Sequence, residues 1–255
     1  MNSELTSEES RRRWNAFAGL WSARVGEMGD RNREAVLTPA LLEMIGSVEG
    51  MRVLDAGCGE GFLSRLLAKR GAEVVAFDYS EEMVRICHDR TPEDLSVIYH
   101  HGSAEKMSFL QNESFDLAIS NIVLVDLEDY QSAIREAFRV LQPGGRYILA
   151  DMHPCFMTEK CGWARDDAGN KLHWTIDNYF NEGPHEERVV LSSENVLIQY
   201  HRTLTSMVRA ILNVGFVIQD LSEPTPTAEA IERDPGWKDD TRITHFIIFD
   251  CQKPA

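Results

Sequence analysis

Short apolar segments alternate with stretches of helical apolar spacing between residues 50 and 151. The pattern predicts strands at 51–55, 73–77, 96–99, 115–120 and 146–150, and helices at 62–70, 81–88 and 130–141. Ser80 is expected to cap the second helix, and the run Pro143-Gly144-Gly145 to end the third. Strand–helix alternation at this spacing predicts an α/β fold, with a mainly parallel sheet covered by helices on both faces.

The alternation is absent from two segments. The first 45 residues have aromatic side chains at helical spacing, and we expect residues 1–45 to form a helical cap over the binding edge of the sheet. Residues 46–255 then form the main domain, interrupted by a polar insertion at about 152–202 with no clean period. A long irregular segment inside a compact domain is usually a lid or binding insertion. From Thr203 we predict a helix through Leu212, strands near 216–220 and 245–250, and a proline-containing loop at 223–240.

A glycine-rich loop follows the first strand. Val53–Gly61 reads Val-Leu-Asp-Ala-Gly-Cys-Gly-Glu-Gly, with alternating glycines directly before a helix. Glycine lets a ligand approach the main chain, and the helix start offers free N–H groups. The dinucleotide fingerprint Gly-x-Gly-x-x-Gly would need a glycine where Phe62 stands, so the pattern is Gly-x-Gly-x-Gly. A plain strand-to-helix turn is the alternative.

Polar residues around this loop favour a nucleoside ligand. Asp55 precedes the glycines, where a carboxylate can organise the loop or meet a cationic group. Asp78 ends the next strand and can accept hydrogen bonds from both hydroxyls of a ribose, or instead cap a helix. The segment Gly102-Ser103-Ala104-Glu105 follows the third strand, where an adenine ring could meet backbone amides.

With these segments in this order, the sequence resembles the class I S-adenosylmethionine-dependent methyltransferases, in particular the small-molecule branch with the generic methyltransferase domain. The resemblance covers roughly residues 30–151 and, more loosely, the two C-terminal strands. The matching segments are Val53–Gly61, Val74–Ser80, Gly102–Glu105, Phe115–Asn121 and Arg139–Gly145. It implies a Rossmann-like, doubly wound sheet of seven mostly parallel strands with an antiparallel last strand. The implied cofactor is S-adenosyl-L-methionine, with S-adenosyl-L-homocysteine as product.

The resemblance also implies roles for individual residues. It places Gly57 and Gly59 near the methionine part of the cofactor, with Asn121 closing that side. Asp78 would hold the ribose. The remaining residues expected around the cofactor are Asp55, Tyr79, Ser80, Ala104 and Glu105, the last two near the adenine.

Methyl transfer to oxygen requires a base, because the acceptor must lose its proton. Candidates follow strand ends, where open α/β sheets bind ligands: Asp126 after the fourth strand and His153 after the fifth. His201, just before the fold resumes, is a third candidate. Each has an ordinary alternative: a helix cap for Asp126, a bond to a loop carbonyl for His153, and an exposed position for His201.

Aromatic and metal-binding residue types gather in the insertion. Trp163, Trp174, Tyr179 and Phe180 would form either a lid over a flat, aromatic acceptor or the small core of the insertion. The histidines and cysteines there are too loosely spaced for a zinc site, and no acidic cluster favours magnesium, so we expect no metal.

The amino-acid composition disfavours some classes of binding partner and favours one cellular compartment. Of 255 residues, 26 are Lys or Arg and 41 are Asp or Glu, giving a net charge of −15 that disfavours a nucleic acid partner. The N-terminus is polar and acidic, and no apolar run approaches the ~18 residues that span a bilayer. Five cysteines without a Cys-x-x-Cys pair favour a reducing compartment. We expect a soluble cytoplasmic protein, monomeric or homodimeric, without a membrane partner.

The leading hypothesis is therefore methyl transfer from S-adenosylmethionine to oxygen or nitrogen of a small organic molecule. The same cofactor would also serve carbon methylation or a non-methylating reaction such as decarboxylation or cyclisation. A non-catalytic binding module that keeps the fold is a third hypothesis, disfavoured by the intact glycine loop and Asp78. A nicotinamide-dependent oxidoreductase is a fourth, weakened by Phe62.

Overall fold

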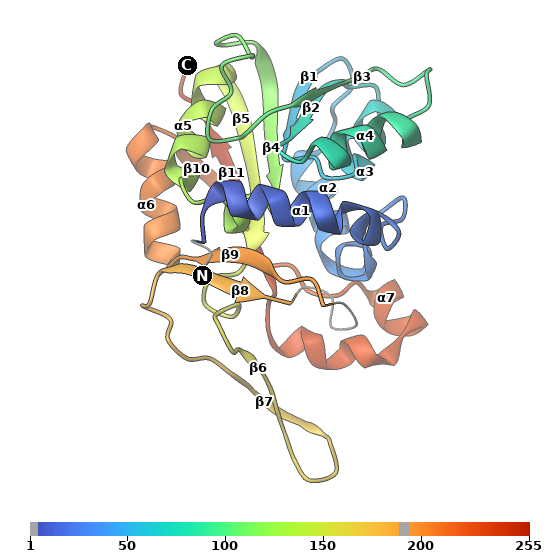
Figure 1. The fold of residues 1–255 in the computed structure, drawn as a ribbon, viewed down its shortest axis with the longest axis vertical. Helices are drawn as coiled ribbons and strands as arrows, with labels where there is room; N and C mark the ends of the chain where they lie inside the picture. Colours follow the sequence, from blue (N-terminus) through green and yellow to red (C-terminus); the bar gives the residue numbers. More distant parts are fainter. Residues whose placement is uncertain (1–4, 189–193) are drawn as a thin grey trace.

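A seven-stranded sheet forms the centre of the computed structural model, which describes residues 5–188 and 194–255 (Figure 1). Its strand order is β10-β11-β5-β4-β1-β2-β3. The strands are β1 (Arg52–Ala56), β2 (Glu73–Asp78), β3 (Val97–His101), β4 (Phe115–Asn121), β5 (Leu141–Met152), β10 (Val217–Ser222) and β11 (Phe246–Gln252). The last strand, β11, is antiparallel to both of its neighbours, β5 and β10, while the other pairs are parallel. The predicted sheet is confirmed.

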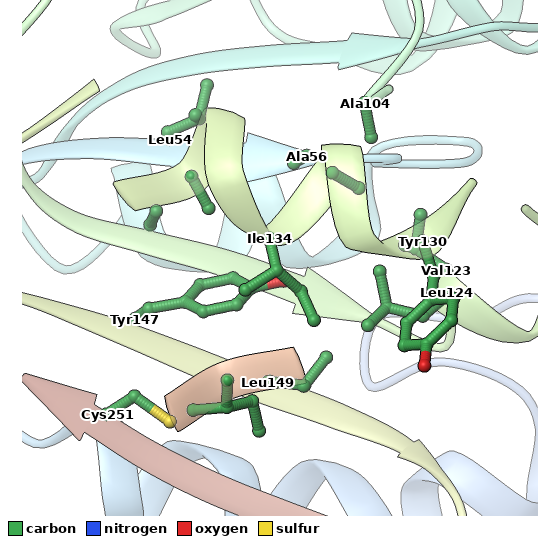
Figure 2. Close-up of a cluster of buried hydrophobic side chains, with 14 of the residues drawn as sticks. Leu54, Ala56, Ala104, Val123, Leu124, Tyr130, Ile134, Tyr147, Leu149 and Cys251 are labelled. Atoms are coloured by element: carbon green, nitrogen blue, oxygen red, sulfur yellow. The ribbon is translucent and has the colours of Figure 1, made fainter. Parts of the chain in front are cut away.

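Helices cover both faces of the sheet. One hydrophobic cluster joins the strands to α5 (Tyr130–Val140) and α6 (Leu204–Val214), and the other joins them to α2 (Thr38–Ile45) and α3 (Phe62–Ala68). Successive side chains of β1 alternate between them, with Val53 in the second cluster and Leu54 in the first. Figure 2 shows Tyr147 and Leu149 from β5 and Ile134 from α5 within the first cluster.

The chain order creates a crevice at the carboxyl ends of β1 and β4. From β1 the chain continues to β2 and β3 on one side, then crosses to β4 on the other side of β1. Connections from adjacent strands then diverge, which leaves space for a ligand beyond the strand ends. The glycine loop lies after β1 and residues 122–126 lie after β4, so the topology brings these two segments together.

The helix α4 (Glu81–Arg90) begins as predicted, with the Ser80 side chain accepting a hydrogen bond from Met83 N at 3.2 Å. The strand β5 begins at Leu141, five positions before the predicted residue 146, and a register shift opposite Phe115 to Leu117 accommodates the early residues. The preceding α5 ends in Arg139 and Val140.

Arg139 ties α5 to the loop after β3. Its guanidinium donates to the carbonyl oxygens of Met107 at 2.8 Å and Leu110 at 3.0 Å, and pairs with Glu136 at 2.8 Å. The side chain is 28% exposed, and both of these hydrogen bonds are partly buried. The Met107 carbonyl also accepts from Leu110 N at 2.9 Å, so Arg139 is needed chiefly for the Leu110 carbonyl.

Two predictions for the C-terminal half are wrong. The insertion is not irregular: β6 (Gly162–Arg165) pairs with β7 (Lys171–Thr175), and β8 (Gly183–Glu187) pairs with β9 (Leu197–His201), as two antiparallel hairpins. Strands β6, β7 and β8 are half-buried or exposed, so no strict apolar alternation marks them. Residues 223–240 include a helix, α7 (Ala228–Arg233), and the start of a 3-10 segment, η3 (Pro235–Arg242). The overlooked signal was Thr227, whose side chain caps α7 by accepting from Ala230 N.

The N-terminal segment contains the predicted helices: α1 (Ser7–Ser22), a π-helical turn η1 (Arg33–Leu37) and α2. Helix α1 contacts α4 and β9, so it connects the sheet domain to the insertion (Figure 1). Among the described residues, no helix has the length and apolar character needed to cross a membrane.

Candidate active site

The glycine loop has a backbone that ordinary residues adopt with difficulty. Gly57 has φ 78° and Gly59 has φ 57°. A Cβ at Gly57 would lie 2.6 Å from Val123 Cγ2, so this glycine also allows the loop to touch the segment after β4. The N–H groups of Gly57 and Cys58 both donate to the Phe77 carbonyl at 2.9 Å, which fixes the loop against the end of β2.

Asp78 holds the loop from the end of β2. Its Oδ2 accepts a hydrogen bond from Gly59 N at 2.9 Å, and its Oδ1 accepts from Ser80 N at 2.8 Å. The side chain is buried, and burial raises the pKa of Asp78 to about 6 against the opposing effect of these two N–H groups. One carboxylate therefore orders both the glycine loop and the start of α4.

Asp55 connects the strand before the glycine loop to the helix after it. It is buried and accepts a hydrogen bond from Ser64 Oγ at 2.6 Å, which connects β1 to α3. Burial raises the pKa of Asp55 to about 6, and the charge of Asp78 contributes in the same direction.

Two adjoining cavities lie at this edge of the sheet. The first lies against the glycine loop, and its lining includes the predicted residues Asp55, Gly57, Gly59, Asp78, Tyr79, Ala104 and Asn121. The second has a volume of about 890 Å³ and is lined from the N-terminal segment, the end of β5 and the insertion. Five residues line both cavities: Trp14, Trp21, Arg33, Ile122 and Asp126.

Ile122 stands at the boundary between the cavities with a strained backbone. Its φ is 56°, which is rare for a β-branched residue, and its N–H donates to the Ala150 carbonyl at 2.8 Å. Such strain persists only where the surrounding structure imposes it, and it concentrates at functional sites.

Two of the predicted cofactor residues lie outside the linings. Ser80 is fully buried and donates from Oγ to Asn15 Oδ1 at 2.7 Å, joining α4 to α1. Glu105 accepts from Ser7 Oγ at 3.0 Å and from Asp129 N at 2.9 Å. Both join the N-terminal helix or the β4–α5 connection to the site, and a direct contact with the cofactor stays a prediction for each.

The three candidate bases have different surroundings. Asp126 ends a 3-10 turn, η2 (Leu124–Asp126), is 8% exposed, and its Oδ1 has no hydrogen-bond partner within the described part of the chain. Burial raises the pKa of Asp126 well above its usual range, the charge of Asp151 adds to this, and the neighbouring Trp14 indole opposes it.

Both candidate histidines have hydrogen-bond partners within the protein. His153 Nε2 lies 2.7 Å from Glu223 Oε1, its Nδ1 accepts from Cys155 N at 3.1 Å, and it lies outside both linings. Burial lowers the pKa of His153, and Glu223 opposes this. His201 lines the second cavity, with Nε2 2.7 Å from the Tyr179 carbonyl oxygen.

Of the four aromatic residues predicted for the lid, Trp174 lines the second cavity. Trp163 packs edge-on against it, with ring centroids 5.4 Å apart, and Phe180 is 86% exposed. Sequence reasoning missed Arg33 and Asp151 among the lining residues. Asp151 is the second-last residue of β5 and directly follows the predicted strand 146–150, so the strand-end rule that selected Asp78 could have found it.

The sequence and the fold of this chain both match known methyltransferases. A family described as "Methyltransferase domain" matches residues 54–149. The crystal structure of an S-adenosylmethionine-dependent methyltransferase from Mesorhizobium loti has a TM-score of 0.76 and 30% identity, covering 89% of this chain and 100% of that one. This chain belongs to the class I S-adenosylmethionine-dependent methyltransferases. Its cofactor is S-adenosylmethionine.

The curated relatives of this methyltransferase match it at lower identity or over a smaller share of the chain. It is 31% identical over 141 residues to a ubiquinone biosynthesis O-methyltransferase of Hydrogenovibrio crunogenus, covering 55% of this chain and 58% of the relative. It is also 24% identical over 202 residues to an uncharacterized protein of Haemophilus influenzae, covering 75% of this chain and 77% of the relative.

Proposed function

We propose that this methyltransferase transfers a methyl group from S-adenosylmethionine to oxygen or nitrogen of a small organic molecule held in the second cavity. The observation that carries the proposal is the set of five residues common to both linings. A donor in the first cavity and an acceptor in the second would meet at these residues. Such an arrangement supplies the alignment that an in-line displacement requires.

The donor side has groups that fit the cofactor. Asp78 faces the first cavity with a carboxylate suited to the ribose hydroxyls. Asn121 Oδ1 is buried without a hydrogen-bond partner among the described residues, so the amino group of the methionine part would satisfy it. We assign the main chain of Gly57 and Gly59 to the same part, and Ala104 to the adenine. The bound cofactor supplies an electrophilic methyl group on a positively charged sulfur.

The acceptor side is built by the parts outside the alternating core. We propose that residues 1–45 and the insertion at about 152–202 form the acceptor-binding part, because α1, β8 and β9 all contribute to the second lining. A volume of about 890 Å³ falls within the roughly 300–1,000 Å³ of small-molecule sites. The names of the quinone O-methyltransferases among its relatives support an aromatic acceptor.

Calorimetric titration with S-adenosylhomocysteine tests the donor site. We expect the native chain to bind and Asp78→Ala to bind at least about tenfold more weakly, since hydrogen bonds to a charged group contribute about 1.5–3 kcal/mol. Asp116→Ala is the matched control, because Asp116 also accepts a backbone N–H, from Arg52 at 2.7 Å, but lies outside both linings. A native chain that fails to bind would refute the proposal.

Acceptors are then identified by incubating the enzyme with metabolite fractions and methyl-labelled donor. Label transferred to an oxygen or nitrogen of a small product supports the proposal. Label transferred to carbon, or cofactor binding without methyl transfer, would replace it with one of the other cofactor-dependent reactions.

A further inference from the structure

We propose that Asp126 is the group that takes the proton from the acceptor, so that the enzyme methylates hydroxyl or amine groups that carry a hydrogen. The inference rests on the proposed function, because it assumes that donor and acceptor meet where the two cavities join.

Asp126 lies where the two cavities join. Of the five residues that line both cavities, Trp14, Trp21 and Ile122 have no side-chain group that accepts a proton near neutral pH. Arg33 is a permanent cation and forms an ion pair with Asp30. Asp126 is therefore the one shared residue, among the described part of the chain, with proton-accepting chemistry.

The carboxyl group of Asp126 has an oxygen that no described residue occupies. Asp126 is 8% exposed, and its side chain accepts no hydrogen bond at Oδ1 from any described residue. Asp151, which lines only the second cavity, is different: it accepts from Val125 N at 3.1 Å and Met152 N at 2.7 Å, and Arg202 lies near its charge. The Trp14 indole lies beside this carboxyl group of Asp126. A buried carboxyl oxygen without a donor is costly unless a ligand supplies one, and an acceptor O–H or N–H would do so at Oδ1.

The charges that face Asp126 come from several elements. Asp151 at the end of β5 and Asp78 at the end of β2 act against its ionisation, and Arg33 in η1 favours it. The phenol groups of Tyr79 and Tyr200 also lie near its charge. A cation arriving at this point would favour ionisation of Asp126, as Arg33 does.

The two histidines are worse placed. Both ring nitrogens of His153 are engaged, by Glu223 and by Cys155 N, and the ring lies outside both linings. His201 lines the second cavity alone, and its Nε2 faces the Tyr179 carbonyl, which can only accept. Neither therefore lies at the point where the cavities join.

Asp126 takes up the acceptor's proton as the methyl group is transferred. A lone pair on the acceptor oxygen or nitrogen forms a bond to the methyl carbon while the carbon–sulfur bond breaks, and the electrons of that bond stay on sulfur. The proton of the acceptor passes to the Asp126 carboxylate, giving a carboxylic acid. Asp126 gives this proton to water when the next S-adenosylmethionine binds, which restores the carboxylate.

Proton release on donor binding tests this placement without knowledge of the acceptor. S-adenosylmethionine and S-adenosylhomocysteine share the ribose, adenine and amino acid groups, and differ in the methyl group and its positive charge. Titrating each ligand at several pH values, in buffer pairs of different ionisation enthalpy, gives the protons released per ligand bound. Because a positive charge favours ionisation of a neighbouring carboxyl group, we expect the native enzyme to release more protons with S-adenosylmethionine than with S-adenosylhomocysteine.

Asp126→Asn is the decisive variant, and Asp126→Ser is the second should the first fail to fold. We expect either variant to abolish the difference between the two ligands while keeping the Kd for S-adenosylhomocysteine within about threefold of native. With an acceptor identified by labelling, kcat should fall by about 10²-fold or more while KM changes little. His153→Gln should keep both the proton release and the turnover.

An unchanged difference in Asp126→Asn, or none in the native enzyme, would overturn the inference. Loss of the difference in His153→Gln alone would assign the role to the histidine. Failure of the proposed function appears separately, as native enzyme that binds neither ligand.

Discussion

Replacing Gly57 by alanine tests the contact between the glycine loop and the segment after β4. Gly57 has φ 78°, and an added Cβ would lie 2.6 Å from Val123 Cγ2 and 2.8 Å from its Cγ1. Val123 is 7% exposed and belongs to the hydrophobic core, so it has little room to move. An alanine at position 57 must therefore adopt an unfavourable backbone conformation and also displace a buried side chain.

The two costs can be estimated separately. A left-handed backbone costs an L-residue about 1–2 kcal/mol, and forced overpacking of a core costs about 1–3 kcal/mol. Gly57→Ala should therefore lower the free energy of unfolding by about 2–5 kcal/mol. Gly59 is the matched control: its φ is 57°, and an added Cβ meets nothing within 4 Å. Gly59→Ala should cost only the backbone part, about 1–2 kcal/mol.

Denaturant unfolding of both variants, of Val123→Ala and of the Gly57→Ala/Val123→Ala double variant measures these costs. Removing the valine methyl groups should recover the steric part, so the double-mutant cycle should give a coupling of about 1–3 kcal/mol. Equal losses in Gly57→Ala and Gly59→Ala, or additivity in the cycle, would refute the steric reasoning.

Further predictions concern the ionisation of Asp55 and Asp78, the partly buried guanidinium of Arg139 and the helix cap at Ser80. Burial raises the pKa of Asp55 and Asp78 to about 6, so the folded chain keeps protons that the unfolded chain loses above about pH 4. Stability without ligand should then fall as pH rises from about 4 to about 6, and Asp78→Asn should make this fall shallower by up to one proton. Arg139→Met should cost about 1–3 kcal/mol in denaturant unfolding because it leaves the Leu110 carbonyl without its described donor, whereas Arg135→Met on the same helix, 55% exposed, should cost under about 0.5 kcal/mol. Ser80→Ala should cost about 1 kcal/mol through loss of the α4 cap, and thermal unfolding that matches native would contradict this.

Short-range sequence patterns were sufficient to predict the alternating strands and helices between residues 50 and 151. Each strand from β1 to β4 follows from a short apolar segment, and each intervening helix from apolar spacing with a recognisable start or stop. The glycine loop could be read in the same way, because Phe62 excluded one fingerprint and Asp78 stood where a ribose partner is expected. These features depend on residues close together in the chain, which is why the order of residues reveals them.

The hairpins of the insertion could not be predicted in this way. Strand β8 contains Gly183, Pro184 and two glutamates, all of which are poor strand formers. It pairs with β9, whose Leu197 and Ile198 are buried. That burial depends on α1 and η2, which contact β9 from distant parts of the chain. Tertiary packing therefore overrides the local preference.

The sequence by itself determined the sheet and the cofactor, because strand periodicity and a glycine loop are local patterns. Only the tertiary structure decided what lies where the two cavities join. Trp14, Arg33 and Asp126 come from α1, η1 and η2, and the fold brings these three separate segments together around the junction of the cavities. The contacts of the candidate bases also come from the tertiary structure: His153 is engaged by Glu223, seventy positions away in the chain, while Asp126 Oδ1 has no described partner. Hydrogen bonds and burial between distant residues are properties of the packed fold, so no spacing within the sequence could reveal them.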